Sequence, residues 1–218
     1  MIHGDVNARD GKNTITNSGK IFGNINTGDA GTFLATGTPK QETIINSGTL
    51  DGGIFTGNGD RSITNSGIMF DLNTGTGNDT MINSKDMGNV LLGDGVNSLT
   101  NSGNIHGQFV SGIGADTVIN KAGAVMNNGI DLGSGANIVD NFGYVHGNIA
   151  GSNYLAIRAG ADADKLTIEA TGVVYGNITL GDGTNTFINL VLSALTQVVS
   201  MVGTTAVLAT MALPTKVI

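Results

Sequence analysis

The sequence predicts an all-β protein, a parallel β-helix (β-solenoid) of about nine or ten coils with 18–19 residues per coil. A repeated register, short alternating segments and glycine-rich corners predict this fold. The register places an apolar residue two positions before an asparagine. Its pairs are Ile15/Asn17, Ile44/Asn46, Ile63/Asn65, Met81/Asn83, Leu99/Asn101, Val118/Asn120, Val139/Asn141 and Phe187/Asn189, with Ile168/Ala170 as the pair that lacks asparagine. A unit this short cannot bury its own core, so stacked neighbours must supply the stability.

Two short strands are expected in each coil. After Asn-Ser-Gly comes an alternation of five residues with glycine at its centre, as in residues 21–25 and 105–109. Its apolar ends follow a period of two and point inward, which is typical of a strand. A second strand, such as 117–120, closes the coil. Because stacked parallel strands lie about 4.8 Å apart, the rod should be on the order of 45 Å long.

Two kinds of corner join these strands. One has the form Gly-x-Gly-x-Asp/Asn, as in residues 93–97 and 112–116. It needs glycine because a tight corner requires positive φ or a close approach of the backbone. At the other corner, we expect the register asparagines to form an amide ladder in which each side chain bonds its counterparts in the neighbouring coils. The predicted ladder consists of Asn17, Asn46, Asn65, Asn83, Asn101, Asn120, Asn141 and Asn189.

The composition fits a turn-rich β structure. Glycine accounts for 35 of 218 residues, charged residues for 12% and aromatic residues for 5%, with no tryptophan. This profile differs from that of an ordinary α/β enzyme. The absence of cysteine excludes disulfides and thiolate metal sites. The net charge of -7 disfavours nucleic acid and anionic membranes as partners.

The repeats predict one solenoid domain over residues 1–189 and an apolar C-terminal segment over 190–218. Two longer steps in the register predict insertions at about 28–41 and 151–165, which are either packed side loops or a binding face. The C-terminal segment fits a cap or assembly element made of a helix or strands, a membrane segment, or a secretion signal.

Repeat units such as 64–67, 100–105 and 180–186 resemble the β-helical passenger regions of bacterial autotransporters and related surface adhesins. The resemblance covers roughly residues 1–189. It implies a right-handed parallel β-helix, an extracellular location, and a structural, adhesive or self-associating role.

A looser resemblance is to the calcium-binding nonapeptide-repeat rolls, whose glycine-rich turns also recur in every coil. The candidate calcium ligands here are Asp94, Asp116 and Asp182. Calcium prefers six to eight oxygen ligands, many of them carboxylate. Asparagine alternates with aspartate at this corner, so a plain glycine corner is the simpler interpretation and no cofactor is expected.

The charged residues do not suggest a catalytic pair. Asp162, Asp164, Lys165 and Glu169 form the one cluster in the sequence, and we interpret it as a solvated loop within the second insertion. Glycoside cleavage needs two carboxyl groups that face each other across a bound sugar. The sequence therefore predicts a protein that is not an enzyme.

Two outward columns of side chains are also predicted. One is a candidate lateral contact surface, because exposed apolar patches mark association sites. It holds His3, Phe22, Phe70, His106, Met126, His146 and Tyr175. The histidines are whole coils apart, too far to share a metal. The second column is rich in threonine and fits either sheet stabilisation or binding of ordered water or carbohydrate.

These observations predict an extracellular or cell-surface structural protein, a self-assembling subunit of a surface filament or matrix. Copies would join head to tail by β-augmentation, so the expected partner is the chain itself. The predicted assembly residues are Ile2, His3, Val6, Leu192, Leu195, Val199, Val202 and Leu208. The alternative is a monomeric adhesin or glycan-binding rod that uses the two insertions. Membrane contact is expected only through the C-terminal segment.

Overall fold

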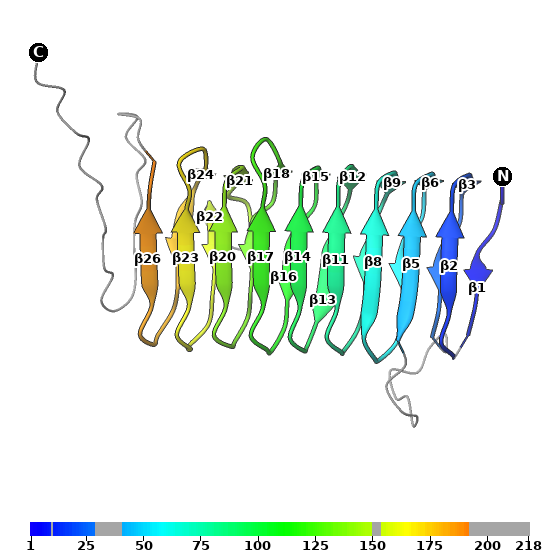
Figure 1. The fold of residues 1–218 in the computed structure, drawn as a ribbon, viewed down its shortest axis with the longest axis horizontal. Coiled ribbons are helices and arrows are strands. Elements are labelled where there is room, and N and C mark those ends of the chain that lie inside the picture. Colours follow the sequence, from blue (N-terminus) through cyan, green and yellow to red (C-terminus); the bar gives the residue numbers. More distant parts are fainter. Residues whose placement is uncertain (10, 29–40, 150–153, 192–218) are drawn as a thin grey trace, which may run out of the picture.

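A computed structural model describes residues 1–9, 11–28, 41–149 and 154–191 of the chain. In these ranges the chain forms three parallel β-sheets stacked into a solenoid of about nine coils, which Figure 1 shows from the side. The predicted all-β class and the predicted parallel solenoid are confirmed. No helix in the described ranges is long and apolar enough to cross a membrane.

Each coil contributes one strand to each sheet, except that the last described coil has no strand in the third sheet, and the order of the strands follows the chain. The first sheet contains β1 (Val6–Asn7), β4 (Ile25–Asn26), β7 (Ile54–Phe55), β10 (Leu72–Asn73), β13 (Val90–Gly93), β16 (Phe109–Ser111), β19 (Ile130–Asp131), β22 (Leu155–Arg158) and β25 (Asn177–Thr179). The second sheet contains β2 (Thr14–Asn17), β5 (Glu42–Asn46), β8 (Arg61–Asn65), β11 (Thr80–Asn83), β14 (Ser98–Asn101), β17 (Thr117–Asn120), β20 (Ile138–Asn141), β23 (Lys165–Ile168) and β26 (Thr186–Asn189). The third sheet contains β3 (Lys20–Ile21), β6 (Thr49–Leu50), β9 (Ile68–Met69), β12 (Asp86–Met87), β15 (Asn104–Ile105), β18 (Val125–Met126), β21 (Tyr144–His146) and β24 (Val173–Tyr175).

The three sheets enclose a single apolar core. Inward residues such as Leu99, Ile105 and Phe109 come from the three strands of one coil, and each is at most 1% exposed. In-register pairing places each of them against an apolar equivalent in the next coil, as with Leu99 and Val118. The core is therefore continuous along the rod, because every coil covers the apolar face of its neighbour.

The prediction of two strands per coil is wrong, because the glycine-centred segment forms two strands instead of one. In residues 21–25, Ile21 belongs to β3 of the third sheet and Ile25 to β4 of the first. A Cβ at Gly23 would lie 2.5 Å from the carbonyl carbon of Gly4. The chain bends there, and the close approach to the previous coil explains the need for glycine.

The register asparagines form a buried column, which we call the Asn ladder. Each side-chain Nδ2 donates to the Oδ1 of its equivalent in the next coil. The six bonds are Asn17–Asn46 (2.8 Å), Asn46–Asn65 (2.8 Å), Asn65–Asn83 (2.8 Å), Asn83–Asn101 (2.9 Å), Asn101–Asn120 (3.0 Å) and Asn120–Asn141 (2.8 Å). Beyond Asn141 the position is occupied by Ile168, which pairs in register with Asn141 and Asn189.

The predicted break of the ladder at Ala170 is therefore misplaced by two residues. Ile168 occupies the asparagine position and Leu166 the apolar position before it, and both are 1% exposed. The predicted second insertion, 151–165, includes strand β22, which joins the first sheet between β19 and β25. Residues 150–153, and residues 29–40 of the first predicted insertion, lie outside the described residues.

We expect Asn83→Ala to destabilise the rod by roughly 2–5 kcal/mol, because it removes one ladder bond on each side and leaves a buried gap. Thr80→Ala, at an exposed position of the same strand, should change the free energy of unfolding by no more than about 0.5 kcal/mol. Urea unfolding followed by circular dichroism measures both. Equal effects of the two substitutions would show that the ladder contributes no specific stability.

Candidate functional site

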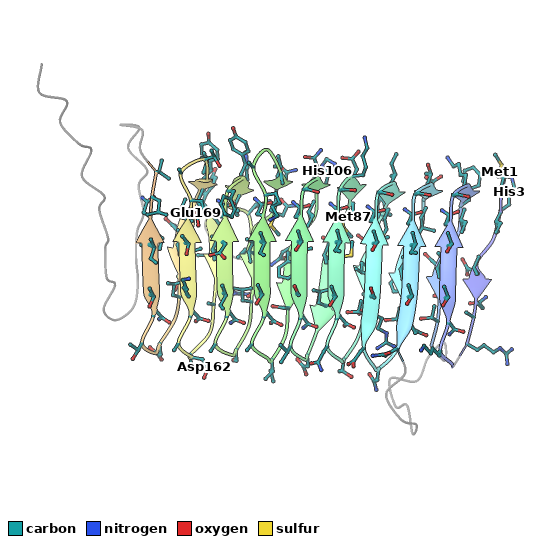
Figure 2. The ribbon with its side chains drawn as sticks, viewed as in Figure 1. Met1, His3, Met87, His106, Asp162 and Glu169 are labelled. Atoms are coloured by element: carbon teal, nitrogen blue, oxygen red, sulfur yellow. The ribbon has the colours of Figure 1, made fainter. Side chains whose placement is uncertain are left out.

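The predicted N-terminal assembly residues lie in the first coil of the rod. Ile2 forms a bridge with Ile21, while Val6 belongs to β1 and pairs with Ile25. Ile2 is 45% exposed and the ring of His3 stacks on the ring of Phe22. Figure 2 shows His3 beside Met1 at this end of the rod. The predicted C-terminal assembly residues, Leu192, Leu195, Val199, Val202 and Leu208, lie outside the described residues.

The candidate calcium ligands do not converge. Asp94 and Asp182 are exposed at the glycine-rich corner, four coils apart, and Asp94 Oδ1 accepts the backbone N–H of Ile113. Asp116 is 1% exposed and faces inward at the same corner. Within the described ranges, no group of three or more His, Cys, Asp or Glu side chains is placed to hold a metal ion.

The glycine-rich corner contains a second buried column, which we call the Asp/Asn column. It consists of Asp79, Asn97, Asp116, Asn137, Asp164 and Asn185. In each step, the side-chain Oδ1 of one residue accepts the backbone N–H of the equivalent residue one coil earlier, at 2.8–3.0 Å. The glycines of this corner adopt the predicted positive φ, as at Gly93 (68°) and Gly95 (137°).

Asparagine and aspartate differ in what the second side-chain atom does. Asn97 Nδ2 donates to the carbonyl oxygens of Gly93 and Gly95 within its own corner. The corresponding Oδ2 atoms of Asp79, Asp116 and Asp164 are buried without a hydrogen-bond partner. Burial raises the pKa of Asp79 to about 6, against the lowering effects of Thr74 and Arg61. Burial also raises the pKa values of Asp116 and Asp164.

The sequence interpretation of Asp164 as part of a solvated loop is wrong. Asp164 is 3% exposed, and its Oδ1 accepts both the backbone and side-chain N–H groups of Asn137. Asp162 and Glu169, which the sequence places nearby, lie at opposite ends of β23 (Figure 2). The four charged residues therefore do not form one cluster, because β23 separates Glu169 from Asp162 and Asp164.

A buried ion pair continues the Asp/Asn column toward the N-terminus. Arg61 and Glu42 occupy the equivalent positions of earlier coils, and Arg61 Nε lies 3.2 Å from Glu42 Oε2. Both side chains are 2% exposed. Thr27 Oγ1 donates to Oε2 of Glu42 and Asn13 Nδ2 donates to Oε1, so both carboxylate oxygens are hydrogen-bonded. The sequence analysis does not predict this pair, because glutamate and arginine differ from the aspartate and asparagine at this position in later coils. Its only signal is that each residue comes one position before an outward hydroxyl residue, Thr43 or Ser62.

The outer edge of the third sheet bears a column of side chains that we call the ring column. It consists of His3, Phe22, Asp51, Phe70, Gly88, His106, Asn127, His146 and Tyr175, each following the last inward residue of its third-sheet segment. The prediction that Met126 belongs to this column is wrong. Met126 pairs with the inward Ile105 and Val145 and is fully buried.

A hollow of about 530 Å³ interrupts the ring column in the middle of the rod. Its rim carries Asp51, Phe70, Asp86 and His106, and its floor includes Gly88. Asp86 Oδ1 accepts hydrogen bonds from Asn104 Nδ2 (3.0 Å) and lies 3.3 Å from His106 Nε2. The bond from Asn104, supported by His106, lowers the pKa of Asp86, so this carboxyl group stays ionised at neutral pH.

The three stacked sheets define the class of this protein, which is a parallel β-solenoid repeat protein. Family models, curated proteins and solved structures contain no match to the chain. Its function is therefore inferred from its own residues and geometry.

We expect the rod to become less stable as the pH rises from about 4 to about 6. The pKa of Asp79 is higher in the folded chain than its ordinary value of 3.8, so the folded state binds more protons in this range. The difference between the folded and ordinary pKa values of Asp79 corresponds to a loss of roughly 3 kcal/mol in the free energy of unfolding. Asp79→Asn should remove this pH dependence and stabilise the rod at pH 7. It replaces a buried carboxyl group by asparagine, which occupies alternate positions of the same column.

The matched variant is Asn97→Asp, which places a second carboxyl group in the next coil of the column. It should lower the melting temperature at pH 7 and steepen the pH dependence. Thermal unfolding between pH 4 and pH 8 measures all three proteins. If Asp79→Asn instead unfolds at a lower temperature at pH 7, the Asp79 carboxylate is stabilising through Arg61.

Proposed function

We propose that the chain is an extracellular or cell-surface structural protein whose copies assemble head to tail into a filament or matrix. The direction of the Asn ladder carries this proposal. Every ladder Nδ2 donates toward the C-terminal coil, so Asn17 Oδ1 faces the end of the first coil. This oxygen accepts one bond, from the backbone N–H of Gly19, and an amide oxygen has a second lone pair.

The sheet edges at the first coil support the same direction of assembly. Among the described strands, β1 pairs only with β4 and β2 pairs only with β5, so each of them forms the edge of its sheet. An edge of this kind is a template for another chain. A preceding coil that donated a side-chain amide to Asn17 would continue both the backbone pairing and the ladder. The edge chemistry therefore favours contact between unlike ends, and such contacts propagate into open filaments unless the rotation closes.

The apolar residues of the first coil would contribute to this contact. Ile2 is 45% exposed, whereas its partner Ile21, one coil further in, is 5% exposed. Val6 and Ile15 are only partly buried and pack against the core from the end. Stacking of another coil would remove these side chains from water, which stabilises association by about 25 cal/mol for each Å² of apolar surface buried.

Val6→Lys should abolish assembly, because it places a charge in the end contact. Phe55→Lys is the matched control, since Phe55 is exposed on β7 in the same sheet, away from the first coil. Sedimentation velocity and negative-stain electron microscopy at rising concentration measure assembly of each full-length chain. Filaments that disappear with Val6→Lys and persist with Phe55→Lys are the expected result.

Leu195→Asp in the full chain tests the other predicted end, and it should also prevent filament growth. Single rods of the unsubstituted chain at every concentration would overturn the proposal. Dimers that stop growing would also contradict it, because they indicate contact between like ends. Loss of assembly in Phe55→Lys alone would move the contact to the side of the rod.

A further inference from the structure

Two pairs of rings in neighbouring coils of the ring column contact each other along the rod. The rings of His3 and Phe22 have centroids 4.8 Å apart and planes 14° from parallel. His146 and Tyr175, also in neighbouring coils, have ring centroids 4.9 Å apart and planes tilted by 50°. Both separations match the coil spacing of about 4.8 Å. The column therefore holds rings at a repeat suited to stacking.

The hollow lies at the coil of the ring column whose residue is Gly88. Phe70, Gly88 and His106 follow one another in the ring column, so the backbones at Phe70 and His106 are two coils, or about 9.6 Å, apart. Gly88 has no side chain to fill the coil between them. A volume of about 530 Å³ is within the size range of small-molecule sites.

The backbone itself keeps this position empty. A Cβ on Gly88 would lie 1.9 Å from the carbonyl oxygen of Phe70, so close stacking of the coils requires glycine there. The gap is consequently a fixed feature of the fold. Phe70 is 63% exposed, which leaves much of its ring free for contact.

The rim of the hollow has carboxylate groups that can accept hydrogen bonds, and each of them already has a neighbouring donor. Asp51 Oδ2 lies 3.0 Å from Lys20 Nζ, and Asp86 is bonded by Asn104 and His106. The carboxylates can accept hydrogen bonds from hydroxyl groups. Because each already has a basic or amide partner, the site suits a neutral ligand rich in hydroxyl groups better than a cation.

We propose that this hollow binds one neutral pyranose ring, held between Phe70 and His106 with its hydroxyl groups on Asp86. A chair-shaped sugar in the gap would contact the ring of Phe70 on one side and, on the other, the ring of His106, which reaches toward Asp86. Its C–H groups would cover the ring faces, and its hydroxyl groups would lie at the rim. The ligand class is a neutral hexose residue, either free or within a glycan, and this function is independent of end-to-end assembly.

The test uses the full-length chain and three probes: methyl β-glucopyranoside, methyl β-galactopyranoside and indole. Titration followed by ¹H–¹³C NMR of the three histidine rings should shift the His106 signal with at least one glycoside, while His3 and His146 stay unchanged. Phe70→Ala should weaken this binding by at least about tenfold. Phe55→Ala, which removes an exposed ring from β7, should leave it unchanged.

Circular dichroism of each variant confirms that the solenoid remains folded. No His106 shift with either glycoside up to their solubility would overturn the proposal. A shift with indole but with neither glycoside would show a site for planar rings and would overturn the sugar assignment. Equal weakening by Phe70→Ala and Phe55→Ala would also contradict it, because the binding would then not depend on the hollow.

Discussion

Parallel stacking at a spacing of about 4.8 Å is the constraint on which the rest of this structure depends. A single coil cannot enclose its own side chains, so each buried group must be satisfied by the equivalent group one coil away. For apolar residues this produces a continuous core. For polar residues it selects side chains that can pair with copies of themselves, and the amide of asparagine has both a donor and an acceptor. The Asn ladder is the direct result.

The same constraint connects stability to function. A hydrogen-bonded column has a direction, because every donor points the same way along the rod. The two ends of such a rod are chemically different, so copies that extend it must meet in one orientation. The column on the third sheet shows a different effect of stacking, since one missing side chain in a regular row creates a hollow bounded by its neighbours.

Sequence patterns predicted those features in which a residue pairs with its own equivalents. The Asn ladder and the glycine corners repeat, and their spacing alone identified the solenoid. The bend at Gly23 was missed because apolar residues four positions apart fit one straight strand as well as two strands in different sheets. The irregular step after Asn141 obscures the register, so the sequence pattern predicts a loop at Asp164 although this residue is buried. The position of Met126 is predicted wrongly because its coil has no glycine-centred segment by which to align it with the other coils.

The pair of Glu42 and Arg61 has a consequence for how the coils find their places. Copies of one repeat are nearly interchangeable, so a folding chain could slide by a whole coil and still match most of its apolar and amide contacts. Sliding by one coil would bury Glu42 beside Asp79, an acidic residue that cannot neutralise it, at a penalty of several kcal/mol. One unlike pair thus sets the register of the coils, because it favours a single stacking over the many that an unbroken repeat would tolerate.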